Sequence, residues 1–299
     1  MSSSIAQHTW ETIQSIHAAQ RLDGLIMQQA MVRLFECLEK DDRVALKSLL
    51  DQGIAIDNLL VKEGETSHPT AERFFPEDFP YSSITAMGWA AWNGDIDVME
   101  RLINLGSDPW LAAAGGRDSL WLAGLGGNPK SWEFLKAKVP DYVGPGFWNA
   151  RAAGGMRHTR LMEMVTATNV DAVAGILSNA GVDVMAVDKA GRTALHLNML
   201  QAPYTDDDQQ IGRMLIDYGA PVRAEDHDGV SPAALADTPE QQALMNVAGL
   251  KEIAEEARAK AAAQKEEIEA QKQGHKPLSE DDADFVQIKK MPKMNRPKF

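Results

Sequence analysis

Apolar residues recur with helical spacing in short segments along the chain, and each segment ends at a glycine. The apolar positions on one side of a helix are Val98, Leu102, Ile103 and Leu105 in one segment and Ile211, Met214, Leu215 and Ile216 in another. The closing glycines stand at positions 53, 106, 181 and 219. Because glycine readily adopts the left-handed conformation that ends many helices, the pattern predicts a series of short amphipathic helices.

A second pattern precedes these helices. The sequence T-A-M-G-W-A-A at 85–91 parallels T-A-L-H-L at 193–197, and S-P-A-A-L-A at 231–236 starts in the same way. The threonine that opens two of the copies can cap a helix, and the alanines that follow let a neighbouring helix approach closely. A polar turn comes before two of the copies, D-K-A-G-R at 188–192 and D-H-D-G-V at 226–230. The chain is therefore predicted to repeat one helix–turn–helix unit.

These residues resemble the ankyrin repeat, most clearly over 85–109 and 182–236. The 33 residues from Thr85 to Asp118 match the ankyrin period. The resemblance implies an all-α solenoid of five to six repeats, because one unit cannot bury its apolar stripe alone. It also implies that His196 bonds the neighbouring turn and that a long concave surface binds another protein.

The sequence departs from the family pattern in the middle of the chain. Gly88 stands where the family usually has histidine, and residues 118–123 read D-S-L-W-L-A, without proline or histidine. Asn198 and Met199 replace small alanines. Local distortion and a coupled partner site are two explanations that the residues leave open.

The solenoid is assigned to residues 25–238, and residues 1–24 are assigned to an N-terminal helical cap. The first 20 residues place apolar side chains at helical spacing, namely Ile5, Trp10, Ile13 and Ile16. A cap over the open face of the first unit is favoured over a partner-binding helix, because terminal repeats need a cover. A degenerate unit is expected within 147–181, which contains A-R-A-A-G-G at 150–155.

Residues 59–84 interrupt the period with an insertion. Prolines at 69, 76 and 80 argue against a regular helix or a central strand in this segment. Its aromatic residues are Phe74, Phe75, Phe79 and Tyr81. Two interpretations stand side by side: a loop folded back on its own helices, which is favoured slightly, and an aromatic patch that contacts a partner.

Residues 239–274 predict one long helix that starts after Pro239 and stops at Gly274. Its apolar residues, Leu244, Val247, Leu250 and Ile253, are confined to the first half, so we expect that half to dock and the second half to project. Residues 275–299 predict an extended charged tail. The basic residues near its end are Lys289, Lys290, Lys293, Arg296 and Lys298. A solvated tail is favoured over a docking peptide for an acidic surface or a tag for export.

Composition narrows the class of protein. The chain has 299 residues, 44% of them hydrophobic, which fits a folded protein, and no apolar run reaches the roughly 18 residues of a membrane span. The net charge is −13, and residues 250–299 carry 11 basic and 10 acidic residues, so the other 249 residues carry a net charge of −14. A body this acidic makes nucleic acid an unfavourable partner. One cysteine and no visible secretory signal predict a cytoplasmic protein, with signal-less delivery outside the cell as an alternative.

No pattern of catalytic residues emerges. The chain has no phosphate-binding loop, nucleophile elbow or paired metal-binding histidines, so no enzyme activity, metal or cofactor is expected. Cys37 lies in an apolar segment and is expected to pack as a small hydrophobic residue. The acidic run at 206–208 is interpreted as a solvated turn.

The family resemblance assigns partner contacts to the turn tips and to the ends of the first helices. Those positions are Trp92, Asn93, Leu125, Lys189, Arg192, Leu200, Gln201, Glu225 and His227. Trp92 is the strongest candidate, since tryptophan is enriched at interface hot spots, whereas Trp89 is expected to face the core. The alternative is that Trp92 packs on the insertion.

We therefore predict a non-enzymatic scaffold that binds a protein of unknown identity, in an unknown oligomeric state. Two alternatives are a bacterial effector or phage-encoded factor that docks a target, and a structural subunit that uses the C-terminal helix and tail. An enzyme hidden in the insertion, with His68, Glu72 and Glu77, is disfavoured.

Overall fold

The computed structural model describes residues 23–62, 67–75, 79–112, 114–141, 143–153 and 155–274. The chain divides into two compact units, Met1–Ala248 and Gly249–Phe299. The apolar residues of the expected N-terminal cap and the basic residues of the tail lie outside the described residues.

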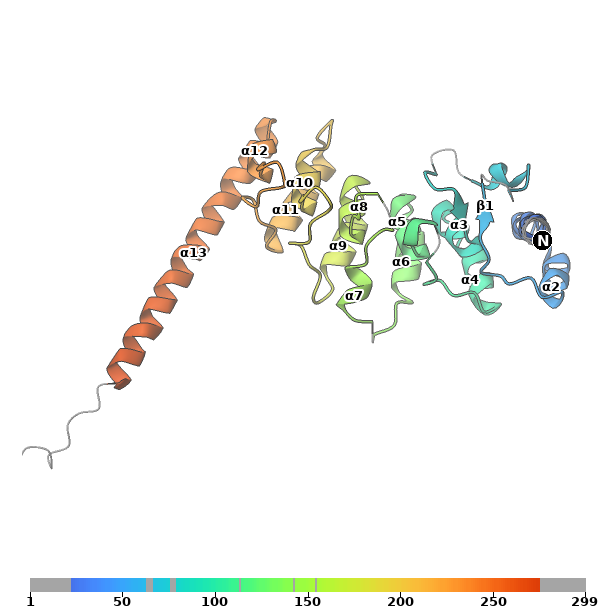
Figure 1. Cartoon of the computed structure of the whole chain (residues 1–299), viewed down its shortest axis with the longest axis horizontal. Helices are drawn as coiled ribbons and strands as arrows, with labels where there is room; N and C mark the ends of the chain where they lie inside the picture. The colour runs from blue at the N-terminus through green and yellow to red at the C-terminus, as the bar shows by residue number, and fades with distance from the viewer. Residues whose placement is uncertain are drawn as a thin grey trace, which may run out of the picture. The chain divides into compact units, whose positions relative to one another are not determined.

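Unit 1 is built from helix pairs that follow one another along the chain (Figure 1). We call the first helix of each pair inner and the second outer. The pairs are residues 23–39 with α2 (Arg43–Asp51), α3 (Ala86–Asn93) with α4 (Ile96–Asn104), α5 (Ser119–Leu125) with α6 (Pro129–Lys136), α8 (Arg160–Thr166) with α9 (Val170–Leu177), α10 (Ala194–Met199) with α11 (Asp206–Asp217), and α12 (Pro232–Leu235) with α13 (Pro239–Gly274). The short α7 (Pro145–Trp148) stands between the third and fourth pairs.

From α3 to α11, each helix contacts its partner in the pair and its counterpart in the neighbouring pair. The inner helices stack in the order α3, α5, α8, α10 and α12, and the outer helices in the order α4, α6, α9 and α11. This nearest-neighbour pattern is that of a solenoid, so the predicted all-α repeat architecture is confirmed. The buried side chains form one continuous core, in which Trp121 and Trp132 are fully covered.

The predicted helix ends are confirmed at both termini. The Thr85 side chain accepts a hydrogen bond from the Gly88 N–H at 3.0 Å and caps α3. The four closing glycines all have positive φ, for example 90° at Gly106 and 88° at Gly219. A residue with a side chain is strained in this conformation, which explains why glycine recurs there.

The turns between one outer helix and the next inner helix form fingers that are linked by backbone hydrogen bonds. The Ala153 N–H donates to the Gly115 carbonyl at 2.7 Å, and the Lys189 N–H donates to the Met156 carbonyl at 2.9 Å. A third bond, also 2.9 Å, joins the His227 N–H to the Ala190 carbonyl. The fingers of the third to sixth repeats therefore form one connected row.

The expected degenerate unit within 147–181 is present and consists of a finger followed by a helix pair. Residues 150–155 belong to its finger, where Arg151 pairs with Thr159 in an isolated bridge. The inner helix starts only after Thr159, whose side chain caps α8 through the Met162 N–H.

The prediction of a solvated turn at 206–208 is wrong. These three acidic residues form the first turn of α11. The Asp208 side chain is almost fully buried, and its carboxylate accepts hydrogen bonds from the N–H and hydroxyl of Thr205. The reason is a capping arrangement: acidic side chains are favourable at a helix N-terminus, where backbone N–H groups are unpaired.

The insertion contains more regular structure than its prolines suggest. Strand β1 (Leu60–Val61) pairs antiparallel with β2 (Ser83–Ile84), and η1 (Ala71–Phe74) forms one short 3₁₀ helix between them. The two strands are only two residues long, and neither contains one of the three prolines. The prediction that the prolines do not lie in a regular helix or a central strand therefore agrees with these strands.

The C-terminal helix α13 spans Pro239–Gly274, as expected, but the boundary between units falls inside it. Its first turns belong to unit 1, where Met245 and Ala248 are buried and the Gln241 side-chain amide donates to the Met199 carbonyl at 2.9 Å. Val247, predicted to pack, is 58% exposed because it falls on the opposite side of the helix from these buried residues.

In unit 2, the described side chains at 258–260 and 262–266 are exposed. Among the described residues, no helix combines the length and apolar character that crossing a membrane requires.

Candidate functional site

The predicted contact residues fall into two rows on the inner helices and fingers. The helix-end row lies where inner helices finish and comprises Trp92, Asn93, Leu125, Leu200 and Gln201, whereas the finger row comprises Lys189, Arg192, Glu225 and His227. The fingers precede the inner helices, so the two rows lie at opposite ends of these helices. An eight-residue helix is about 12 Å long, so the two rows are neighbouring but distinct surfaces.

Exposure differs along these rows. Leu200 is 47% exposed, and Asn93, Lys189, Glu225 and His227 are also exposed. The remaining members, Trp92, Leu125, Arg192 and Gln201, are half-buried.

Trp92 is half-buried because the insertion packs on it. The Phe79 ring meets the Trp92 ring edge-on at a centroid distance of 4.9 Å, and Phe75 and Tyr81 pack in turn on Phe79, at 5.7 and 5.2 Å. This is the alternative arrangement considered for Trp92. Edge-on aromatic pairs add to the stabilisation gained by burying their area.

Trp89, expected to face the core, is only half-buried. Phe35 and Phe74 contact it, with centroid distances of 5.6 and 6.5 Å. The insertion thus covers both tryptophans of α3.

Phe74, Phe75 and Phe79 are 3%, 6% and 4% exposed, and Tyr81 is half-buried. The expected alternative of an exposed aromatic patch does not describe these three rings, because they pack within the fold. Burial, together with the nearby Glu163 carboxylate, raises the pKa of Tyr81 to about 12.

Two buried ion pairs join the third and fourth repeats, and the sequence patterns gave no warning of them. Arg160, which is fully buried, binds Asp118 through both guanidinium Nη atoms, and its Nη1–Oδ1 distance is 2.9 Å. Arg117 binds Glu163 through Nε and Nη2, and the Trp121 indole N–H donates to the same carboxylate at 2.8 Å.

Two of these charged residues, Arg160 and Glu163, occupy positions where the fifth repeat has small or apolar residues. Thr159-Arg160-Leu161-Met162 aligns with Thr193-Ala194-Leu195-His196, which places Arg160 at an alanine position. That alignment, with the acidic cap at Asp118, is the signal that could have revealed the pair. Since both partners are buried and hydrogen-bonded, we assign them to packing between repeats.

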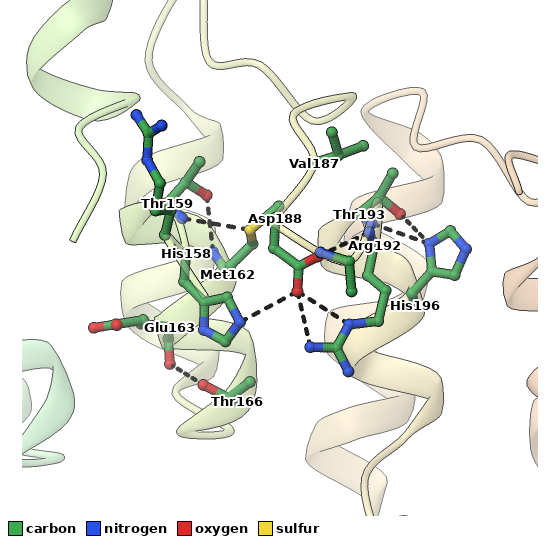
Figure 2. Close-up of polar contacts among 12 residues, drawn as sticks. His158, Thr159, Met162, Glu163, Thr166, Val187, Asp188, Arg192, Thr193 and His196 are labelled. Atoms are coloured by element: carbon green, nitrogen blue, oxygen red, sulfur yellow. Dashed lines mark hydrogen bonds and ion pairs between the residues drawn. The ribbon is translucent and has the colours of Figure 1, made fainter. Parts of the chain in front are cut away.

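A third polar centre, around Asp188, ties neighbouring fingers together (Figure 2). Its carboxylate accepts from the guanidinium of Arg192 at 2.9 and 3.0 Å, and from the backbone N–H groups of Ala190 and Arg192. The His158 Nε2 lies 3.4 Å away, on the preceding finger. Burial alone would raise the pKa of Asp188, but the hydrogen bonds from Arg192 and Ala190 lower it.

The finger at 226–230 repeats this geometry. The Asp226 carboxylate accepts from the N–H groups of Asp228 and Val230, just as Asp188 accepts from the residues two and four positions later. These bonds, chiefly that from Val230, lower the pKa of Asp226. The two polar turns identified in the sequence therefore have the same structure.

Two observations describe the chemical groups that could bind a metal ion or react. Within the described ranges, no group of three or more histidine, cysteine, aspartate or glutamate side chains is placed to hold a metal ion. Cys37 is 8% exposed in the core, and burial raises the pKa of its thiol, which opposes formation of the reactive thiolate.

Comparison with known proteins supports this architecture through structure alone. No protein-family model matches the chain, and no curated protein matches it in sequence. The structure is similar to the crystal structure of an ankyrin repeat domain from Acinetobacter baumannii, with a TM-score of 0.52 and 24% sequence identity. The match covers 72% of this chain and 97% of that domain. The fold is the ankyrin-repeat fold.

His196 occupies the histidine position of the ankyrin pattern and links two repeats. Its Nδ1 accepts a hydrogen bond from the Thr193 N–H at 3.0 Å, so Nε2 carries the proton and donates to the Val230 carbonyl at 3.1 Å. Burial lowers the pKa of His196, which favours this neutral form. Both ring nitrogens are engaged, as the ankyrin resemblance implied.

Proposed function

We propose that the chain is a non-enzymatic protein-binding scaffold of the cytoplasm whose main contact lies on the C-terminal ankyrin repeats. The observation that carries this proposal is the contrast between two equivalent helix ends. Trp92, at the end of α3, is covered by Phe79, whereas Leu200, at the end of α10, is 47% exposed. Because the chain's own insertion covers the equivalent Trp92, Leu200 is the large apolar side chain of the helix-end row that stays accessible to a partner.

The proposed surface combines both rows where the insertion does not reach. Its members are Lys189, Arg192, Leu200, Gln201, Glu225 and His227 from the original set. Trp92 packs on Phe79 of the insertion, so the protein's own aromatic rings partly occupy the face there. Trp92, its chain neighbour Asn93 and Leu125 of the next repeat are therefore assigned a secondary role.

Affinity capture with matched baits tests this proposal. We expect Leu200→Asp to lose the captured protein, and Trp92→Asp to retain it as long as the variant stays folded. A bait that ends at residue 249 should retain it too. Loss with Trp92→Asp alone, at unchanged thermal unfolding, would move the contact to the insertion side and contradict the proposal.

A structural subunit is the second candidate, favoured by α13. The described side chains of α13 at 258–260 and 262–266 are exposed, so they are available to a neighbouring subunit. Loss of the captured protein on removal of residues 250–299, with retention by Leu200→Asp, would favour this candidate.

A further inference from the structure

Two neighbouring fingers of the fourth and fifth repeats carry a cluster of basic and apolar side chains. We call it the finger patch. Its basic members are Arg151, Arg157 and Lys189, and its apolar members are Met156, Met185 and Val187.

Hydrogen bonds join five of these six residues. The Lys189 N–H donates to the Met156 carbonyl at 2.9 Å, which joins the two fingers. The Arg151 guanidinium donates through Nη1 to the carbonyls of Arg157, at 3.0 Å, and of Val187, at 2.7 Å. The patch is thus one surface held together by backbone and side-chain hydrogen bonds.

The charges of the patch are not neutralised within the fold. Arg151, Arg157 and Lys189 are exposed, and in the part of the chain that the structure describes no carboxylate forms an ion pair with any of them. The nearby Asp188 carboxylate is occupied by Arg192 and by backbone N–H groups.

The groove between α2 and α4, of about 740 Å³, shows the opposite behaviour. Its basic lining residues pair with carboxylates of the same groove, with Arg101 2.8 Å from Asp41 and Lys47 2.9 Å from Asp51. The finger patch differs from this groove because its cations have no carboxylate partner among the described residues.

The apolar members are exposed as well. Met156 is 37% exposed, Val187 42% and Met185 55%. Methionine is flexible and polarisable, so it adapts to apolar side chains of different shape.

We infer that the finger patch binds an extended segment of a partner protein in which acidic side chains flank apolar ones. The inference rests on the proposed function and adds the chemistry of the partner. Arginine matches a carboxylate with paired hydrogen bonds, and the exposed methionines and valine would receive the apolar side chains.

The surroundings fix where such a segment lies. Residues 1–249 hold 33 acidic and 19 basic residues, three of which are the cations of the finger patch, so the rest of this part of the chain repels an acidic segment. The next finger carries Asp226 and Asp228, which disfavour an acidic segment, so we place the segment on the two fingers that carry Arg151, Arg157 and Lys189. Three cations in this acidic body make a poor footprint for nucleic acid, which needs many phosphate contacts.

Selection from a phage-displayed library of random decapeptides against the full chain tests the inference. We expect enrichment of peptides that contain both acidic and apolar residues. The leading peptide is then synthesised and its Kd measured by fluorescence anisotropy. Arg157→Glu and Lys189→Glu should each weaken binding at least about tenfold, because each replaces an attraction with a repulsion, and Met185→Ser about threefold.

Lys130→Glu is the matched control, since it makes the same charge change at an exposed position of α6. Its Kd should stay within about twofold at 150 mM salt, where distant charges are screened. Enrichment of basic peptides would overturn the inference. So would acidic peptides whose Kd is the same for the Arg157→Glu and Lys189→Glu variants as for the unchanged chain.

Peptides lost with Leu200→Asp but indifferent to the finger variants would overturn the finger patch and leave the proposed function standing. If the library enriches nothing, the inference fails, and the capture experiment separately decides the proposed function. Binding of a single-stranded oligonucleotide with higher affinity than the leading peptide would also refute it.

Discussion

The second and fifth repeats share one backbone design and use their inner helices differently. In the second repeat, Phe79 and Phe74 from the insertion pack on Trp92 and Trp89, so aromatic contacts within the chain cover the surface of α3. In the fifth repeat, Leu200 at the end of α10 remains 47% exposed. The comparison teaches that repeats of equal architecture are not equal as binding surfaces, because a local insertion can occupy the face that a partner would use.

The buried ion pairs lie between these two regions. Their removal should give the largest change in the free energy of unfolding. Replacing Arg160 with methionine leaves the Asp118 carboxylate buried without its partner and should cost about 3–5 kcal/mol of unfolding free energy. Urea unfolding followed by tryptophan fluorescence measures this, since all seven tryptophans lie within residues 1–248.

The double variant Arg160→Met/Asp118→Asn should recover a large part of the loss, because the asparagine can still cap α5 and no charge remains buried. Arg43→Met, which removes a cation from an exposed pair, should leave the urea midpoint almost unchanged. Equal losses for Arg160→Met and Arg43→Met would show that burial of the pair has no energetic consequence.

The insertion gives the next largest effect. Phe79 is 4% exposed, so Phe79→Ala should cost about 3 kcal/mol of unfolding free energy and increase the exposure of Trp92 to water. Leu200→Ala is the comparison on the open side and should change the free energy by less than about 0.5 kcal/mol. Acrylamide quenching of tryptophan fluorescence reports the exposure. If Phe79→Ala left the free energy of unfolding unchanged, the insertion would not stabilise α3.

A smaller, pH-dependent effect should come from His196 in the fifth repeat. Burial lowers its pKa in the folded state, so on acidification the unfolded chain binds a proton before the folded chain does. The free energy of unfolding should therefore decrease as the pH falls from 7.5 to 5.5, through the ordinary histidine pKa of about 6.5. His196→Asn should be less stable at pH 7.5 and show a smaller decrease on acidification.

His227→Asn serves as the control for this titration, because His227 is exposed on the next finger. It should retain the full decrease seen in the unchanged chain. A decrease that survives in His196→Asn would assign the pH dependence to another group.

Most of the fold could be predicted from patterns of neighbouring residues. Helix-capping threonines, closing glycines and apolar stripes each depend on a few adjacent residues, so the positions of α3, α4, α10 and α11 followed from the sequence. The Asp-x-x-Gly turns at 188–192 and 226–230 are local for the same reason. Asn198, a departure from the repeat pattern, proves to be buried and donates to the Asp208 carbonyl at 2.9 Å.

Long-range partners account for what sequence did not reveal. Arg160 and Asp118 are 42 positions apart, and only an alignment of the repeats, which places Arg160 at an alanine position, indicates that the helices bring them together. The cover over Trp92 depends likewise on how the insertion folds back. Exposure of a contact residue is set by such distant segments, which is why the helix-end and finger rows could be named but their accessible members could not be chosen.

The two-stranded ladder at the base of the insertion has an evolutionary consequence. Leu60 lies opposite Ile84 and Val61 opposite Ser83, so the chain leaves the solenoid and returns to it at adjacent points. Everything between those points can be lengthened, shortened or exchanged over generations while the spacing of the stacked helices stays the same. A lineage that trimmed this segment would uncover Trp92 and gain fresh surface, at the cost of the buried Phe74, Phe75 and Phe79 side chains.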